Sequence, residues 1–241
     1  MTDFTEANRK YFDQLAVSYQ DRFADSMKML SEQTLQNRLW ISDQWKDTVS
    51  QDQDIRMLEY ACGPGMISMT LAPFLTQVIG IDVSDNMVEQ FNHNSGLLGL
   101  TDKVIGHTAD LLAENIPVEF SGPPYKDLDL VTISMALHHF ENPANALQQL
   151  GGRLKKGGVC YIIDLVSHSG HGHGNGGDKH DFGNAAHTVK SHGFSQENMQ
   201  ELFQGAGFGA VGYKILDQPL VFSRDGKNIS KTVFIARAQR V

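Results

Sequence analysis

The sequence predicts an α/β protein built on a doubly wound, mostly parallel sheet of seven strands. From Ile55 onward, short apolar runs of strand length alternate with helical segments. This order is typical of a parallel sheet whose connections are helices. The last two predicted strands, 210–216 and 231–238, have no helix between them. They are therefore expected to pair as an antiparallel hairpin at one edge of the sheet.

Two helical regions precede the first strand. Apolar side chains in 4–19 recur at the spacing of an amphipathic helix, and a second helical region is expected over 27–47. The polar run at 50–54 ends this extension. The expected organisation is a helical cap over 1–54 followed by a ligand-binding domain over 55–241.

The elements of the larger domain follow in order. Strands are expected at 55–60, 77–81, 103–107, 127–134 and 157–165, and helices at 66–75, 85–99, 142–154 and 195–208. Ser195 is expected to cap the last helix, and Gly207 to end it. A turn, DGKN, is expected between the two final strands.

Composition bounds the function. The chain has 241 residues, 41% of them hydrophobic, and a formal net charge of −8, which argues against a nucleic-acid partner. No apolar run approaches the roughly 18 residues of a membrane span, and the first residues are polar. Cys62 and Cys160 form no disulfide framework. We expect a cytoplasmic protein without membrane contact, as a monomer or homodimer.

The residues that follow each strand point to a ligand site, because ligands of open α/β sheets bind outside the carboxyl ends of the strands. Small residues after the first strand, through Gly63 and Gly65, let the backbone approach a ligand closely. Asp82 ends the second strand, about 20 residues beyond, where a carboxylate accepts hydrogen bonds from ribose hydroxyls. Asp110 follows the third strand and is a candidate partner for a purine amino group.

Five segments in this order resemble the motifs of the class I S-adenosylmethionine-dependent methyltransferases. They are LEYACGPG, IDVSDNM, TADL, DLVTISMALHHFENP and LKKGGVCYIID. The resemblance covers roughly 55–165 by motif and extends to the C-terminus by strand order. It implies a Rossmann-like methyltransferase fold, S-adenosyl-L-methionine as cofactor, and an enzyme that transfers a methyl group.

The resemblance also implies which residues contact the cofactor. They are Glu59, Gly63 and Gly65 for the methionine part, Asp82 for the ribose, Val83, Met87, Asp110 and Leu111 for the adenine, and Ser134, Met135 and His138 for the reactive side. Ala61 stands where the family has the first glycine of its GxGxG motif. Its backbone is expected to approach the cofactor if its φ is negative. A dinucleotide-binding fold is the alternative, but GxGxxG is absent.

Methyl transfer is a direct displacement, so a base is needed only when the acceptor arrives protonated. His138 and His139, just after the fourth strand, are the candidate bases, and at most one is expected to face the methyl group. Each has a structural alternative, as lining or packing residue. Tyr19 either contacts the cofactor or substrate or packs in the core. His187 is a candidate pocket residue, and His192 is expected to be structural.

The tract 168–182, HSGHGHGNGGDKHDF, is rich in histidine and glycine. Three interpretations compete: a lid with substrate contacts, a flexible insertion, and a metal site. Its position after the fifth strand favours a mobile loop over 167–194 that covers the acceptor. No metal is expected, because glycine-rich sequence offers no rigid frame for ligands.

We expect a small-molecule acceptor that takes the methyl on nitrogen, oxygen or sulfur. A protein or tRNA methyltransferase is the first alternative, and a basic groove or recognition domain would support it. A non-catalytic cofactor-binding partner subunit is the second. Retention of acidic and glycine positions such as Glu59, Gly63 and Asp82 argues against it.

Overall fold

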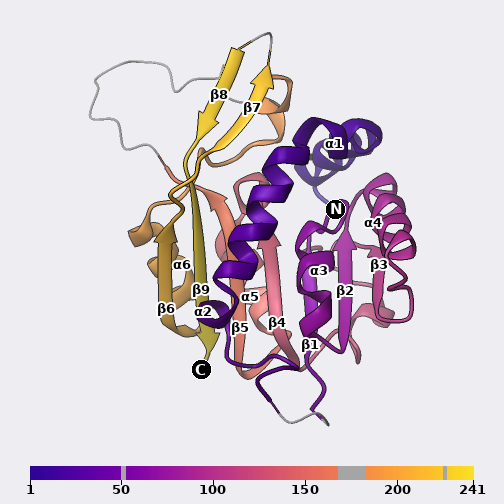
Figure 1. Cartoon of the computed structure of the whole chain (residues 1–241), viewed down its shortest axis with the longest axis vertical. Coiled ribbons are helices and arrows are strands. Elements are labelled where there is room, and N and C mark those ends of the chain that lie inside the picture. Colours follow the sequence, from indigo (N-terminus) through magenta and orange to yellow (C-terminus); the bar gives the residue numbers. More distant parts are fainter. Residues whose placement is uncertain (50–52, 168–182, 225–226) are drawn as a thin grey trace.

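A computed structural model of the protein describes residues 1–49, 53–167, 183–224 and 227–241. Its main sheet has seven strands: β1 (Arg56–Tyr60), β2 (Gln77–Asp82), β3 (Val104–Thr108), β4 (Leu128–Ser134), β5 (Leu154–Leu165), β6 (Phe208–Ile215) and β9 (Val233–Arg240). They lie in the order β3-β2-β1-β4-β5-β9-β6 (Figure 1). The first five are parallel, and β9 runs antiparallel to both β5 and β6. The predicted fold class is confirmed.

Helices cover both faces of this sheet. They are α1 (Asp3–Gln36), α2 (Arg38–Ile41), α3 (Met66–Leu71), α4 (Asp85–Leu97), α5 (Pro143–Gly151) and α6 (Gln196–Gly205), with short 3₁₀ turns η1 (Ala72–Phe74), η2 (Val118–Phe120), η3 (Leu137–His139) and η4 (Gly183–Thr188). Successive strand residues enter opposite cores. In β1, Met57 packs with α3 and α4, and Leu58 packs with α5 and α6. Burial on both faces explains the continuous apolar runs of these strands.

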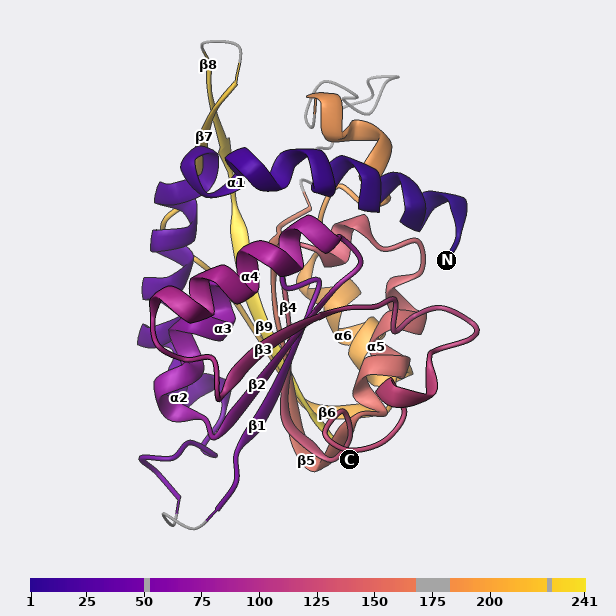
Figure 2. The ribbon, with the colours of Figure 1, turned by 90° about the vertical axis from the view of Figure 1, so that its right-hand side faces the viewer.

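The N-terminal cap has two helical segments, as predicted, but no gap separates them. They meet within α1 at a kink at Phe23 (φ −117°, ψ 16°), so helix also covers the rest of 20–26. This segment contains no glycine or proline, so nothing in it stops a helix. The first half of α1 lies across the carboxyl end of the sheet, and the second half turns down one face (Figure 2). Residues 42–49 form turns instead of helix, around the buried ring of Trp45.

The helix ends follow their predicted signals. The Ser195 hydroxyl accepts a hydrogen bond from the Asn198 backbone in a capping box, and Gly207 after α6 adopts φ 81°. Both predictions are confirmed. Within the described parts of the chain, no helix is long and apolar enough to cross a bilayer.

The C-terminal region contains an element that the sequence analysis missed. β6 and β9 pair antiparallel as predicted, but a second hairpin, β7 (Leu220–Arg224) and β8 (Lys227–Lys231), lies between them. It forms a separate two-stranded sheet that projects beyond the carboxyl end of the main sheet, next to α1 (Figure 1). The sequence DGKN, of which 225–226 lie outside the described residues, therefore falls at the junction of β7 and β8 in the chain and not between β6 and β9 directly. A D-G pair between two strand-like runs is the signal that would have identified it.

Glycines hold α4 close to the sheet. The ring of Phe91, which is fully buried, lies against Gly80 of β2, Gly106 of β3 and Gly65 at the start of α3. A methyl group at any of the three positions would overlap this ring. The close approach fixes α4, and with it the loop after β2.

We predict that Gly80→Ala lowers the free energy of unfolding by about 1–3 kcal/mol, because the added methyl overpacks the Phe91 ring. Urea unfolding measures the change. Gly122→Ala is the matched control, since no atom lies within 4 Å of a methyl group there. Adding Phe91→Leu to Gly80→Ala should recover part of the loss, and strictly additive effects of the two substitutions would contradict the contact.

Candidate active site

A cavity of about 600 Å³ lies at the carboxyl ends of β1, β2 and β4 and is covered by the first half of α1. Five segments line it, with Thr5, Asn8, Phe12 and Tyr19 from α1, Tyr60, Ala61 and Gly63 after β1, Asp82, Val83 and Met87 after β2, Asp110, Leu112 and Ala113 after β3, and Ser134, Met135 and His139 after β4. The strand-end residues that sequence analysis selected thus share one cavity, as the parallel sheet requires.

Asp82 is the central acidic group of this cavity. It is 7% exposed and accepts hydrogen bonds from the backbone N–H groups of Gly63 and Ser84, both at 2.9 Å. Burial raises the pKa of its carboxyl to about 6, although these donors act in the opposite direction. The carboxylate is therefore short of donors, and a ligand that donates hydrogen bonds would favour its charged form.

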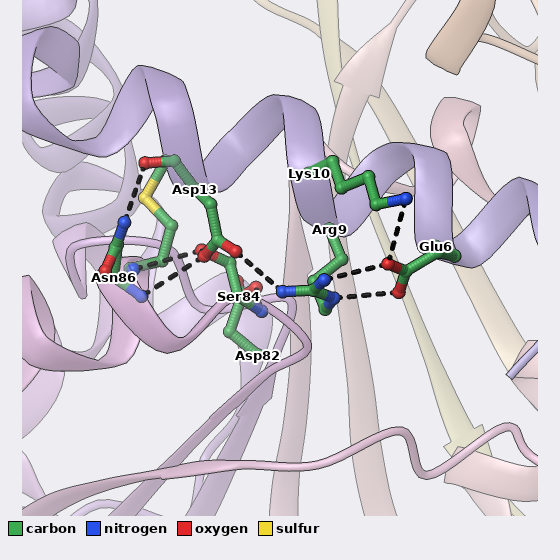
Figure 3. A network of polar contacts seen from close by, with 8 residues as sticks. Glu6, Arg9, Lys10, Asp13, Asp82, Ser84 and Asn86 are labelled. Carbon is green, nitrogen blue, oxygen red and sulfur yellow. Dashed lines mark hydrogen bonds and ion pairs between the residues drawn. The ribbon is translucent and has the colours of Figure 1, made fainter.

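A polar network joins α1 to the loop that carries Asp82 (Figure 3). The Ser84 hydroxyl donates to Oδ1 of Asp13 at 2.6 Å, and the Asn86 side chain donates to the Asp13 carbonyl at 3.0 Å. Arg9 donates to the other carboxylate oxygen of Asp13 at 2.8 Å and also pairs with Glu6. The cap helix is thus fastened at the edge of the cavity that it covers.

The loop after β1 has an unusual backbone. Ala61 adopts φ +54°, so the negative φ on which its expected close approach to the cofactor depends is not observed. Ala61 thus has the left-handed backbone that a glycine adopts without strain. For alanine this conformation is sterically unfavourable. Gly63 also has a positive φ, and open space surrounds the position of a side chain there. Gly65, which the analysis placed beside the cofactor, lies instead against Phe91 and lines neither cavity.

Glu59 lies beneath this loop. It is 2% exposed, and its Oε2 accepts hydrogen bonds from the Ser68 backbone at 2.9 Å and the Ser68 hydroxyl at 2.5 Å. Burial raises the pKa of its carboxyl to about 7. Two buried carboxyls, Glu59 and Asp82, therefore flank the backbone of Gly63.

The ends of β3 and β4 complete the cavity. The Asp110 carboxylate accepts from the Tyr60 hydroxyl at 3.2 Å and the Leu112 backbone at 3.0 Å. Leu111 is fully buried in the core, and Leu112 takes the lining position expected for it. After β4, the Ser134 hydroxyl is buried without a hydrogen-bond partner among the described residues. Such an orphaned group at a cavity wall indicates a ligand contact.

A second cavity, of about 200 Å³, adjoins the first and is called the side chamber here. Its lining comes from α1, the β1 loop, η3, β5, η4 and the β7–β8 hairpin, with Tyr11, Phe12, Leu15, Tyr19, Arg22, Phe23, Met27, Glu59, His138, His139, Leu165, Ala185, Leu220, Phe222 and Lys231 among its residues. Seven residues line both cavities: Phe12, Tyr19, Ala61, Gly63, Ser134, Met135 and His139. The two spaces therefore meet between α1, the loop after β1 and the end of β4.

The adjacent histidines have different surroundings. His138 is 4% exposed, and its Nδ1 lies 2.7 Å from Oδ1 of the buried Asp164. His139 is partly buried, and its Nδ1 lies 2.8 Å from the Thr188 carbonyl. The pKa of His139 is held well below 6.5, first by burial and then by the neighbouring His138. Their rings lie 4.1 Å apart.

The remaining predicted site residues, Tyr19 and His187, differ in whether they line the cavities. Tyr19 lines both cavities, and burial raises the pKa of its hydroxyl to about 12. His187 is exposed and packs edge-on against Tyr11, outside both cavity linings. The structure therefore does not bring His187 into the site. His192 is exposed as well. The tract 168–182, and with it most of the expected loop 167–194, lies outside the described residues.

The sequence analysis missed Asp164, Tyr60 and Phe222. Asp164 lies at the end of β5, so the strand-end rule that selected Asp82 would have found it. Phe222 belongs to the unrecognised hairpin and left no such signal. In the part of the chain that the structure describes, no three histidine, cysteine or acidic side chains gather in a way that would hold a metal ion.

Comparison with known proteins places these features in a family. A family model described as a methyltransferase domain matches residues 19–211. An uncharacterised methyltransferase of Schizosaccharomyces pombe is 27% identical over 232 residues, which cover 86% of this chain and 80% of that protein. A ubiquinone biosynthesis O-methyltransferase of Burkholderia vietnamiensis is 28% identical over 121 residues, which cover 50% of this chain and 49% of the relative.

Solved structures share the fold. A SAM-dependent methyltransferase from Anabaena variabilis is similar over 100% of this chain and 96% of its own, with a TM-score of 0.65 and 16% sequence identity. At this identity the likeness shows the fold alone.

We predict that Ala61→Gly raises the free energy of unfolding by about 0.5–1 kcal/mol. Glycine removes the left-handed strain, which destabilises the alanine protein by about 1–2 kcal/mol. Glycine also makes the unfolded chain more flexible, and this offsets part of the stabilisation. Urea unfolding measures it. Ala144→Gly in α5, an exposed helical position, should instead lose about 1 kcal/mol. A loss of stability at both positions would contradict the strain at Ala61.

We also predict that Asp82→Asn becomes more stabilising, relative to wild type, as pH rises from 5 to 8 without cofactor. The folded pKa of Asp82 is raised from 3.8 to about 6, so the wild type has the full stability of the protonated group below pH 4 and loses it as pH rises through 6. Asparagine has no such loss. Urea midpoints at both pH values measure the difference, and Asp102→Asn, an exposed position, is the control. If the difference in urea midpoint between Asp82→Asn and wild type were the same at both pH values, the pKa of Asp82 in the folded protein would not be raised.

Proposed function

The chain belongs to the class I S-adenosylmethionine-dependent methyltransferases, and we propose that it transfers a methyl group to a small-molecule acceptor bound in the side chamber. One observation carries the proposal: two adjoining cavities meet at Ser134, Met135 and His139. An in-line displacement requires the acceptor atom and the methyl carbon to be held together. The junction of the two cavities offers a place where this can occur.

Features of the larger cavity fit the cofactor. The Asp82 carboxylate is short of donors, and ribose hydroxyls supply them. Open space at Gly63 leaves its backbone accessible, and the Ser134 hydroxyl is an unpartnered group at the wall among the described residues. A volume of about 600 Å³ lies within the usual range of cofactor sites. We therefore assign the ribose to Asp82 and the reactive side to Ser134 and Met135.

The other assignments follow from position. Val83, Met87 and Asp110 line the same cavity beyond Asp82, and we assign the adenine to them. Glu59, which lines the side chamber near Gly63, is assigned to the methionine part. Tyr19 contacts both spaces and would touch the cofactor or the acceptor.

When bound, the cofactor supplies the methyl group and a sulfur leaving group that departs uncharged. The chain's own residues bind, orient and exclude water. The first half of α1 covers the larger cavity with Phe12 and Tyr19. A hydrogen bond from Ser84 to Asp13 holds this helix to the loop after Asp82. A covered site keeps water from competing with the acceptor. His138 and His139 are the candidate groups to receive a proton.

Three observations support a small acceptor. The side chamber is small, about 200 Å³, and α1 and the β7–β8 hairpin form part of its lining. The net charge of −8 disfavours a nucleic-acid backbone. The relatives named as O-methyltransferases of ubiquinone biosynthesis favour oxygen among the acceptor atoms.

We predict that isothermal calorimetry detects S-adenosylmethionine binding to the full chain, and that Asp82→Ala weakens it by about 10- to 100-fold. Hydrogen bonds to charged groups contribute about 1.5–3 kcal/mol, and a tenfold change corresponds to about 1.4 kcal/mol. Asp102→Ala, an exposed position outside both cavities, should bind with wild-type affinity. No binding at millimolar cofactor, or equal affinity of wild type and Asp82→Ala, would overturn the cofactor assignment.

A further inference from the structure

The carboxylate of Asp164 is organised around His138. Asp164 ends β5 and is fully buried. Its Oδ1 accepts from the Leu165 backbone at 2.6 Å, and its Oδ2 accepts from the His138 backbone at 3.2 Å. Backbone donors on both oxygens identify an acceptor-only, ionised carboxylate, so the hydrogen in the contact with His138 belongs to Nδ1. Asp164 therefore fixes the tautomer of His138, which leaves the basic lone pair of the neutral ring on Nε2.

His139 has no such partner. Its Nδ1 donates to the carbonyl of Thr188, which only accepts, so this ring also carries its hydrogen on Nδ1. No carboxylate contacts it among the described residues, and its pKa lies well below 6.5. A carboxylate stabilises the positive charge of an imidazolium, and burial alone opposes it. Of the two rings, His138 is the one built to become charged.

The side chamber around His138 has aromatic walls. Tyr11, Phe12, Tyr19 and Phe23 come from α1, and Phe222 comes from β7. Aromatic side chains bind ring-shaped partners by edge-to-face and offset contacts. The chamber's volume of about 200 Å³ lies below the usual range of drug-sized ligand sites, so it suits a small ring.

We propose that the acceptor is a phenol, and that His138, positioned by Asp164, takes its proton. This inference rests on the function proposed above, on the His138–Asp164 bond, and on the place of the His138 ring in the chamber wall. A carboxylate acceptor has no proton to lose at neutral pH, which would leave the buried pair without a role. An ammonium acceptor would enter a chamber whose lining includes two basic side chains, Arg22 and Lys231, and one acid, Glu59, whose pKa burial raises to about 7.

The step that this assigns is a proton transfer coupled to displacement. The O–H bond of the phenol breaks, its electron pair stays on oxygen, and its proton binds Nε2 of His138. The oxygen then shares an electron pair with the methyl carbon, while the carbon–sulfur bond breaks and its pair leaves with sulfur. His138 returns the proton to water after the ether departs. Asp164 keeps its charge throughout and acts as a positioning residue.

The pH dependence involves the titratable and charged groups that contact His138 or line the same chamber within the described residues. They are Asp164 of β5, His139 of η3, Glu59 of β1, Cys62 after β1, Lys231 of β8, and Tyr11, Tyr19 and Arg22 of α1. Because Asp164 stabilises the imidazolium, its replacement by a neutral group should let His138 lose its proton at lower pH.

The test uses the full chain with S-adenosylmethionine and four probes: phenol, 4-nitrophenol, benzylamine and benzoate. We expect methyl transfer to the phenols. His138→Gln should lower kcat with phenol by about 100-fold or more, and should remove the acidic limb of its pH profile. With 4-nitrophenol at pH 8, where the probe is already ionised, the same variant should lose less than about 10-fold. Asp164→Asn should move the acidic limb to lower pH.

Three controls separate this role from folding and from the cofactor assignment. His93→Gln on α4, exposed and outside both cavities, should keep the wild-type rate and limb. Calorimetry should give wild-type cofactor affinity for His138→Gln and Asp164→Asn, which also shows that they fold. In proton NMR of the full chain, the low-field resonance of the His138 Nδ1 hydrogen should be lost in Asp164→Asn and kept in Asp102→Asn.

Other outcomes overturn the proposal. Cofactor binding without methylation of either phenol, methylation of benzylamine or benzoate alone, or a His138→Gln variant that keeps the rate and acidic limb would each do so. If His139→Gln, and not His138→Gln, removed the acidic limb of the pH profile, the base would be His139. Absence of cofactor binding would instead remove the proposed function, so the two failures are distinguishable.

Discussion

The hydrogen bonds around the Asp82 carboxylate are the constraint on which the site depends. A buried carboxylate needs donors, and Asp82 obtains them from the backbone of Gly63 after β1 and of Ser84 before α4. Ser84 in turn donates its hydroxyl to Asp13 of α1. One side chain thereby sets the relative positions of two sheet-edge loops and of the helix that covers them. These hydrogen bonds fix the distances between the three segments, and the cavity lies between them.

The two cavities share part of their walls but differ in the rest. Asp82, Val83 and Asp110, which line the larger cavity alone, fall within 19–211, the range that matches the family model. Phe222 and Lys231, which line the side chamber alone, fall outside it. The cofactor assignment can therefore draw on the family, whereas the acceptor must be argued from α1 and the β7–β8 hairpin of this chain.

The sequence predicted the sheet well because each strand combines an apolar run with a clear punctuating turn. The strand-end rule also selected Asp82 and Asp110, and the family resemblance selected Ser134; all three line one cavity, because the carboxyl ends of parallel strands share one edge. It failed where the signal was not local. The kink at Phe23 has no glycine or proline to announce it, and Ala61 carries a left-handed backbone that an alanine does not suggest. Likewise, nothing near His187 in the sequence indicated that its ring would face solvent.

The His138–Asp164 pair follows from the same sheet geometry that produces the cofactor edge. β4 and β5 are parallel neighbours with Ser134 opposite Ile163, so the residues just beyond β4 lie beside Asp164, the penultimate residue of β5. Met135, at φ +53°, turns the chain sharply, and the short η3 then brings His138 back against Asp164. The two buried strand-end acids differ in one respect. Among the described residues, Asp82 has only backbone donors and no partner of opposite charge, which suits a ligand. Asp164 already has an imidazole, so its role is to hold that ring and stabilise its charge, and this is what the removal of a proton from a bound acceptor requires.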